Sequence, residues 1–318
     1  MEMHTLDPEE YVFWRPAPGH SLTVGPERKE VLLPEIPLPL KKNNLTDNPG
    51  YDLIGSSIYD YLRHFPDCPN NAVYAGVLRD AYPQNIADLG AQIVMLEHKE
   101  VDAPYLRRKI SYMKILLLLD PENVGLLQRL GMSCYELALV FSELYESRRN
   151  LLIALGYLCQ AERVTSPDPQ TLNLIGQINF LLGDFPVATR YWRLLLDHVA
   201  AFPGRQELIG RIERLNDEPV PDEPLIVELE SVAVAAQLYT RREYNEALIR
   251  LETIEESGSL PRDLPMAPFY YLLALCRDRT NDHAGAFDAL EKALTVDPDF
   301  APAHQARECF LERGRLAE

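Results

Sequence analysis

The clearest pattern of apolar positions runs from Phe269 to Pro298, where small and bulky residues recur at helical spacing. Two antiparallel helices approach closely only where Ala or Gly lines their crossing, while larger residues three and four positions apart fill the grooves beside it. The segment therefore predicts a helical hairpin whose helices meet at small side chains. The positions that carry the pattern are Tyr270, Leu273, Ala274, Ala286, Leu290, Ala293 and Pro298.

The same spacing recurs in three further segments. Counted from Pro169, it gives Leu172, Ile175, Gly176, Ala188 and Trp192. Counted from Glu228, it gives Val234, Ala235, Leu238, Ala247, Leu251 and Ile254. Counted from Val124, it begins with Leu127, Leu130 and Gly131, but Ala154, Leu158 and Ala161 follow eleven residues late. Eleven residues are about three helical turns, so we expect a lengthened helix pair that keeps its packing face.

With Ala267, Pro169, Glu228 and Val124 each taken as position 1 of a 34-residue unit, residues 122–318 resemble the tetratricopeptide repeat (TPR) superfamily. The resemblance implies an all-α fold, a TPR-like solenoid of helical hairpins with a concave inner surface. Members of the superfamily use that surface mostly to hold peptides or other proteins. Because a fold of this kind serves many functions, the resemblance identifies no specific member and no partner.

Residues 1–50 form a different region, a proline-rich arm with the apolar clusters Tyr11–Trp14 and Val31–Leu40. Proline at alternate positions disfavours both a helix and a central strand, so we expect an extended or polyproline-like arm. A disordered tail would contain fewer aromatic and aliphatic residues. The arm therefore packs either on the chain's own repeats or on a partner.

The rest of the chain divides into four further parts. Residues 51–121 predict irregular helices, with candidates at Ile54–His64, Ile86–Lys99 and Pro104–Leu119. Residues 122–217 form one TPR-like lobe, and residues 225–318 form a second, which ends in a capping helix with a polar outer face. The acidic, proline-rich stretch 218–224 predicts a stiff linker between the lobes. Asp-Pro pairs at positions 120, 168 and 297 predict helix N-caps followed by proline in the first turn.

Charge and composition narrow the classes of partner and cofactor. The net charge is −17, with short basic patches only, which argues against nucleic-acid binding. Five scattered cysteines and seven dispersed histidines form no metal-ligand spacing, so we expect no metal and no cofactor. The start of the chain has no secretory signal pattern, and no apolar run approaches the roughly 20 residues of a membrane span. We therefore expect a cytoplasmic protein.

The TPR resemblance also implies which side chains line the concave surface, since positions 2, 5, 9, 12 and 13 of each first helix usually do so. The surface would be rich in amides and aromatic rings, which suit recognition of an extended peptide. An alternative is that several of these residues pack beneath an inserted loop or the arm. The candidate protein-binding residues are Gln128, Tyr135, Asn173, Gln177, Phe180, Tyr239 and Tyr271.

No enzymatic motif stands out: the sequence has no phosphate-binding glycine loop, no nucleophile elbow and no zinc-protease motif. We therefore expect a non-catalytic adaptor or scaffold that holds a protein segment and recruits or assembles a larger complex. Two alternatives stay open, a secretion or assembly chaperone and an accessory subunit of a multi-subunit enzyme. The sequence does not determine the partner or the oligomeric state.

Overall fold

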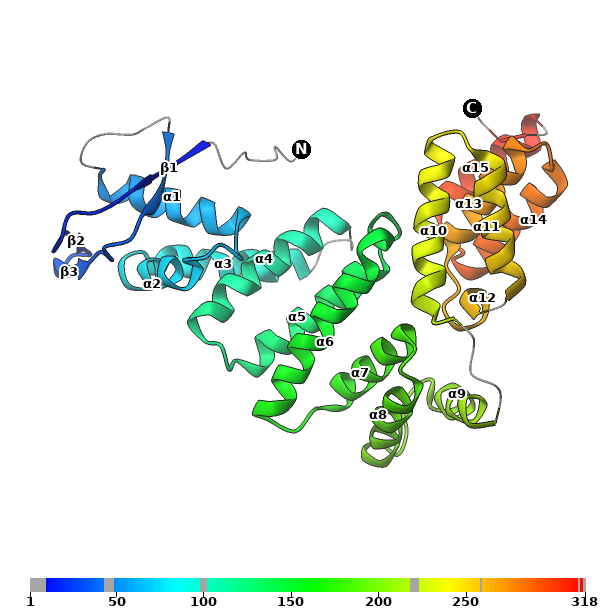
Figure 1. Cartoon of the computed structure of the whole chain (residues 1–318), viewed down its shortest axis with the longest axis horizontal. Helices are drawn as coiled ribbons and strands as arrows, with labels where there is room; N and C mark the ends of the chain where they lie inside the picture. The colour runs from blue at the N-terminus through cyan, green and yellow to red at the C-terminus, as the bar shows by residue number, and fades with distance from the viewer. Residues whose placement is uncertain are drawn as a thin grey trace. The chain divides into compact units, whose positions relative to one another are not determined.

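The computed structural model of the protein describes residues 10–42, 49–97, 102–217, 223–257, 259–313 and 315–316. The described residues are mostly helical, and the strands are confined to the N-terminal arm (Figure 1). The chain divides into two compact units, Met1–Cys134 with Gly156–Ser166, and Tyr135–Leu155 with Pro167–Glu318.

The N-terminal arm is extended, as its prolines predict, but its strands pair with one another. Strand β1 (Tyr11–Trp14) runs antiparallel to β4 (Leu38–Lys41), and β2 (Ser21–Val24) runs antiparallel to β3 (Lys29–Leu32). Pro39 lies opposite Phe13 in the first pair. A sheet of two strands has only edge strands, which tolerate a residue without an amide hydrogen. The alternate prolines therefore exclude a central strand without excluding a ribbon.

The described part of the arm packs on its own chain, on helix α1 (Tyr51–His64) rather than on the repeats (Figure 1). Leu38 and Leu40 are fully buried, and the backbone amide of Lys41 donates to Ser57 Oγ at 3.1 Å. The ring of Tyr11 lies 5.0 Å from the ring of Tyr61, centre to centre, in an edge-to-face contact. The arm thus packs within its own chain, but on α1 and not on the repeats that the first alternative named; the second alternative, packing on a partner, stays a prediction.

In the first unit, helix α1 makes a close contact with Tyr82, the residue that follows α2. A Cβ placed on Gly55 would overlap the ring of Tyr82, whose hydroxyl donates to the carbonyl of Tyr51 at 2.7 Å. Helix α2 is absent from the three sequence candidates, and Lys99, at the end of one candidate, lies outside the described residues. The helices are α2 (Asn71–Ala81), α3 (Pro83–Glu97), α4 (Ala103–Leu119) and the first part of α5 (Val124–Leu139).

The lengthened helix pair predicted near Val124 contains an insertion. Helix α5 is followed by the 3-10 helix η3 (Phe141–Glu146) and then by α6 (Ser147–Val164). The predicted packing residues Ala154, Leu158 and Ala161 are all buried, so the packing face is preserved. Part of the extra length forms η3, which packs against α10 (Leu225–Thr240) of the same unit.

The second unit contains three TPR-like hairpins, whose crossings are lined by small buried residues as predicted. In each hairpin the two helices pack side by side, and α11 also packs on α13 and α14 on α15. The crossing residues are Gly176, Ala188, Ala235, Ala247, Ala274 and Ala286. The helices are α7 (Pro169–Leu182), α8 (Phe185–His198), α9 (Arg205–Asp217), α10, α11 (Tyr244–Ser257), α12 (Ser259–Asp263), α13 (Ala267–Arg279), α14 (His283–Val296) and α15 (Ala301–Arg313).

Two of the three predicted Asp-Pro caps are wrong. Asp168 does cap α7, because its side chain accepts a hydrogen bond from the amide of Thr171 at 2.9 Å. Asp120 instead follows the last residue of α4, and Asn123 accepts from the amide of Leu126 at the start of α5. Asp297 follows the last residue of α14. Proline also suits the turn after a helix, so the dipeptide alone does not distinguish a start from an end.

The boundary between the predicted lobes lies mostly outside the described residues. Of the predicted linker 218–224, only Glu223 and Pro224 are described, and Pro224 immediately precedes α10. Helices α9 and α12 connect across this boundary, since Arg214 pairs with Asp263 at 2.7 Å and Arg211 donates to the carbonyl of Asp263 at 3.2 Å. The carboxylate of Asp263 is 4% exposed and the side chain of Arg214 is 33% exposed, so the ion pair is partly buried.

Candidate protein-binding groove

The predicted binding residues on α7 do not all reach solvent. Asn173 and Gln177 are half-buried, whereas Phe180 is 6% exposed. The ring of Phe180 lies 5.6 Å from the ring of Trp192, centre to centre, and the guanidinium of Arg211 lies 5.0 Å from the centre of the Phe180 ring. Phe180 therefore packs within its hairpin beneath a side chain of α9, and it does not line an open surface.

Tyr135 also lies near Arg211 of α9. It is half-buried, and burial raises the pKa of its hydroxyl to about 12, although the nearby charge of Arg211 acts in the opposite direction. Burial lowers the pKa of Arg211 itself. One side chain of α9 thus approaches both Tyr135 and Phe180. The alternative named an inserted loop or the arm as the cover, whereas the element that lies over these residues is a helix. Gln128 is half-buried on α5, in the other unit.

Tyr239 and Tyr271 lie close together on α10 and α13. Burial raises the pKa of Tyr271, and the proximity of Tyr239 adds to the shift. The ring of Tyr271 lies 5.8 Å from that of Phe300, and Arg279 forms a hydrogen bond with Tyr239 that raises the pKa of the arginine. These two tyrosines are the predicted residues that the structure brings together, and neighbouring side chains partly cover both of them.

Leu316 contacts α13 at Asp278, seven residues after Tyr271. Asp278 is 8% exposed, and its Oδ1 accepts from the amide of Leu316 at 3.2 Å and lies 2.9 Å from Nδ1 of His283. Leu316 is itself 4% exposed. The face expected to be concave therefore contains packed contacts at both α7 and α13.

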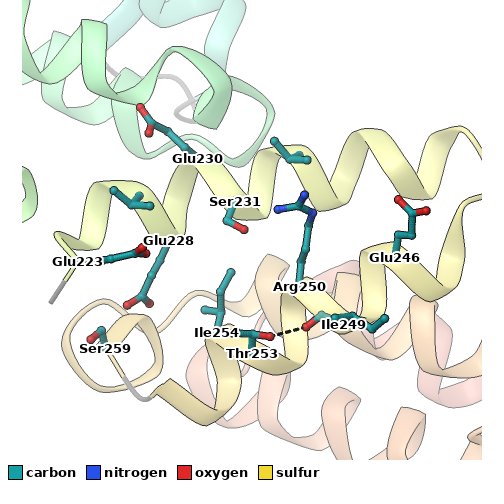
Figure 2. Close-up of a pocket in the computed structure, with 12 residues that line it drawn as sticks. Glu223, Glu228, Glu230, Ser231, Glu246, Ile249, Arg250, Thr253, Ile254 and Ser259 are labelled. Carbon is teal, nitrogen blue, oxygen red and sulfur yellow. Dashed lines mark hydrogen bonds between the residues drawn. The ribbon is translucent and has the colours of Figure 1, made fainter. Parts of the chain in front are cut away.

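An open groove lies elsewhere, along α10 and α11 with α12 at one end (Figure 2). Its volume is about 990 Å³, which is within the range of small-ligand and peptide sites. The lining residues come from both helices of one hairpin and from the loop and turn beside it. They are Glu223, Val227, Glu228, Glu230, Ser231, Val234, Glu246, Ile249, Arg250, Thr253, Ile254 and Ser259.

Apolar side chains of this groove remain open to solvent. Ile249 is 65% exposed and Val234 is 39% exposed, and they come from the two facing helices. Val227 and Ile254 line the same surface at greater depth. Two large aliphatic side chains facing one depression form a surface that gains free energy when a partner covers it.

The polar lining of the groove is acidic, with four glutamates and one arginine. Glu230 forms a bidentate pair with Arg148 of α6, at 2.7 and 2.9 Å, and this hydrogen bonding lowers its pKa. Glu223 and Glu246 are exposed and lie at opposite ends of the groove in Figure 2. Among the described residues, neither forms an ion pair. An exposed carboxylate therefore lies at each end of the groove, and the exposed Arg250 lies one helical turn from Glu246.

Glu228 has a structural role at the base of the groove. It is 8% exposed, and its carboxylate accepts from the backbone amide of Leu260 at 2.7 Å, at the first turn of α12. Burial raises the pKa of Glu228, and the hydrogen bonds to Leu260 and Ser259 partly offset that shift. Its carboxylate holds α12 in place, so we assign it no catalytic role.

Sequence reasoning missed this groove although it used two of its residues. Val234 and Ile254 were assigned to positions 7 and 27 of the repeat, where the neighbouring unit has Leu273 and Ala293. The available signal was the acidic, proline-rich stretch 218–224 just before α10, because it interrupts the repeat spacing of the sequence at this point.

Nothing in the described residues suggests a metal or redox centre. No group of three or more His, Cys, Asp or Glu side chains is placed there to hold an ion. Burial raises the pKa values of the Cys134 and Cys276 thiols to about 12, which disfavours the reactive thiolate. No single described helix is long and apolar enough to cross a membrane. Helix α5 and residues 141–164 are together long and apolar enough, but they are bent by 106° relative to each other.

Comparison with known proteins finds similarity among solved structures but not among sequences. No family model and no curated protein matches the sequence. Among solved structures, the chain is similar to the TPR domain of P58(IPK), with 13% sequence identity and a TM-score of 0.34. The alignment covers 83% of this chain and 65% of that one, so the chain spans just under two thirds of the solved domain. The TPR-like character described above rests on the three hairpins and not on this similarity.

Proposed function

We propose that the protein is a non-catalytic adaptor that binds a segment of a partner protein in the groove of α10, α11 and α12. The observation that carries the proposal is the exposure of Val234 and Ile249 on facing helices of a packed hairpin. A groove with an apolar floor and charged ends is typical of protein-recognition surfaces, where buried apolar area supplies affinity and charges supply specificity.

Two further features support binding rather than chemistry. The buried acid of the groove, Glu228, accepts hydrogen bonds from the first turn of α12, and Glu230 is paired with Arg148. The TPR resemblance of residues 122–318 also implies a protein-binding role. We place the protein in the cytoplasm, and we propose that it recruits or assembles a larger complex.

The proposal is tested by affinity capture of the tagged full-length chain from its native host, with chemical cross-linking and mass spectrometry. We expect a partner in stoichiometric amount, cross-linked to α10 or α11. Ile249→Arg should deplete that partner by about tenfold, since a charge replaces an exposed apolar contact. Leu311→Arg on α15 is the matched control, because Leu311 is 70% exposed and lies outside the groove.

The original expectation for the concave face is tested in the same experiment. The double variant Asn173→Ala/Tyr271→Ala should leave capture intact if the groove is the working surface. Loss of the partner in this variant, with retention in Ile249→Arg, would move the binding site to the α7 and α13 faces. Recovery of no stoichiometric partner with the unmodified chain would contradict the adaptor function.

A further inference from the structure

The groove occupies the face that another helix covers in the next hairpin of the same stack. With Glu228 and Ala267 as position 1, Ser231 and Val234 correspond to Tyr270 and Leu273. In the second helices, Arg250 and Ile254 correspond to Ala289 and Ala293. The two hairpins therefore present equivalent positions, and the difference between them lies in what packs on those positions.

In the hairpin of α13 and α14 this face is closed. Leu273, Ala289 and Ala293 are fully buried, and Tyr270 is 8% exposed. Helix α11 packs on α13, and its Glu255 pairs with Lys292 at 2.6 Å and with Arg277 at 2.7 Å. The element that covers a face of this type in this protein is thus an α-helix, which combines apolar contacts with ion pairs at the edge.

In the hairpin of α10 and α11 the same face is closed only at its margin. The 3-10 helix η3 and helix α7 pack on α10, and Arg148 of α6 pairs with Glu230, but Ile249 on α11 remains 65% exposed. Within the described ranges, no helix covers Ile249. A helix lying along α11 between Glu246 and Ile254 would meet the side chains that the preceding hairpin meets in a continuous stack.

The charge of the groove selects among possible helices. Glu223 and Glu246 lie at its two ends, and the chain as a whole carries a net charge of −17. A second copy of this chain would bring like charges together, which disfavours self-association through this face. A helix with lysine or arginine beside its apolar stripe would place opposite charges at both ends.

We propose that the groove of α10, α11 and α12 binds a basic amphipathic α-helix of a partner protein, an inference that rests on the proposed adaptor function. The apolar stripe of that helix, at spacings of three and four residues, lies on Val234, Ile249 and Ile254. Its basic residues lie near Glu223 and Glu246. This is recognition of a helix in a groove, with the helix taking the place of the missing neighbour in the stack.

The inference is tested with the full-length chain and three fluorescent synthetic peptides of about five helical turns, roughly 18 residues. The first has a leucine stripe flanked by lysines, the second has the same stripe flanked by glutamates, and the third has the composition of the first in scrambled order. Fluorescence anisotropy at about 0.15 M salt gives the dissociation constants. We expect the first peptide to bind at least about tenfold more tightly than the other two.

Groove variants then assign the binding to this surface. Ile249→Arg should weaken the lysine-flanked peptide at least about tenfold, and Leu311→Arg should leave it unchanged. The double variant Glu223→Lys/Glu246→Lys should weaken the lysine-flanked peptide and strengthen the glutamate-flanked one. Ile249, Glu223, Glu246 and Leu311 are all exposed, and circular dichroism of each variant confirms that the fold is retained.

Three outcomes overturn the inference: no peptide binds, the scrambled peptide binds as tightly as the striped one, or the groove variants bind like the unmodified chain. If these occur while capture from the host still depends on Ile249, the adaptor function stands and its ligand is not a basic helix. If the peptide results are as expected but capture yields no partner, the adaptor function fails and helix binding by the groove stands.

Discussion

The hairpins α7–α8 and α13–α14 follow the same repeat register but close their crossings with different pairs of residues. The first pairs Gly176 with Trp192, and the second has Ala274 and Leu290 at the equivalent positions. A Cβ placed on Gly176 would lie within 3.0 Å of three atoms of the Trp192 indole. The larger ring in one helix thus requires the smallest residue in the other.

The difference shows that a repeat position specifies a shared volume rather than a residue type. Protein interiors are packed to nearly constant density. A larger side chain on one helix of a crossing therefore requires a smaller side chain on the other helix. The tryptophan at this crossing lowers stability in one respect, because its buried indole nitrogen has no hydrogen-bond partner among the described residues. Leucine and alanine in α13–α14 bury no side-chain polar atom.

The largest expected effect comes from overfilling the crossings. Gly176→Leu and Ala286→Leu should each lower the free energy of unfolding by about 1 to 3 kcal/mol, since neither site has room for the added methyl groups. Gly176→Leu should be the more damaging, because it meets a rigid indole. Thermal or chemical denaturation measures both effects.

The matched control is Ala284→Leu, which lies on α14 two residues before Ala286 but is exposed. It should change stability by less than about 0.5 kcal/mol. Equal losses in Ala284→Leu and Ala286→Leu would show that the repeat register does not describe the crossing.

A second prediction converts one crossing into the other. Gly176→Ala and Trp192→Leu should each destabilise the protein, the first by overpacking and the second by leaving a cavity. Together they recreate the pair found in α13–α14, so their combined cost should be smaller than the sum by about 0.5 to 3 kcal/mol. A double-mutant cycle measures this coupling, and strict additivity would contradict the shared-volume interpretation. Gly176→Ala combined with Ala274→Gly, in separate hairpins, serves as the additive control.

The helix starts sharpen the comparison further, because α7 has a side-chain cap and α13 has none. Asp168 accepts from both the amide and the hydroxyl of Thr171, whereas Met266 precedes α13 without a capping bond. Asp168→Ala should cost about 0.5 to 2 kcal/mol in denaturation. Asp168→Asn keeps a capping oxygen and should cost less; equal costs would indicate that the cap contributes little.

The smallest expected effect concerns Glu228 in the hairpin α10–α11, and it depends on pH. Burial raises the pKa of Glu228 above its unfolded value of 4.5, so the folded state binds the proton more tightly. The stability contributed by this group is present below about pH 4.5 and is lost as pH rises through the folded pKa. Glu228→Gln retains an acceptor for Leu260 and removes the buried charge.

The variant should therefore unfold at a higher temperature than the unmodified chain at pH 7, and the two melting temperatures should converge near pH 4. Melts of both proteins across this range provide the measurement. A lower melting temperature for Glu228→Gln at pH 7 would show that the hydrogen bonds of the carboxylate outweigh its desolvation.

Much of the fold could be predicted because it depends on contacts close in sequence. Ala274 and Ala286 meet within one hairpin, and the extended conformation of the arm follows from the restricted backbone of proline. The pairing of β1 with β4 could not be predicted, since it joins residues 24 to 30 positions apart whose individual strand preferences are weak. Helix α2 was missed although Asn70 precedes it and Pro83 follows it, which are ordinary start and stop signals. Its 11 residues include Gly76, which lowers helix propensity.

The candidate site was harder to predict than the fold, and Phe180 shows the reason. Its repeat position suggests an exposed ring, but Arg211 of α9 lies over it, and nothing within the hairpin specifies where α9 packs. Ile249 is the opposite case: it is exposed because no described helix packs over it, which its own hairpin does not determine. Tyr239 and Tyr271 lie close together in the structure, and their role in binding stays a prediction.

The hairpins and their small-residue crossings could be predicted from the sequence. Each crossing depends on residues that lie a few turns apart in two connected helices. Which outer face stays open was decided by the folded molecule. The positions of η3, α9 and α12 determine whether Phe180, Val234 and Ile249 are covered, and these positions result from many weak long-range contacts. Burial of a face is a property of its neighbours, so a repeat pattern alone predicts the hairpin but not the surface that it leaves for a partner.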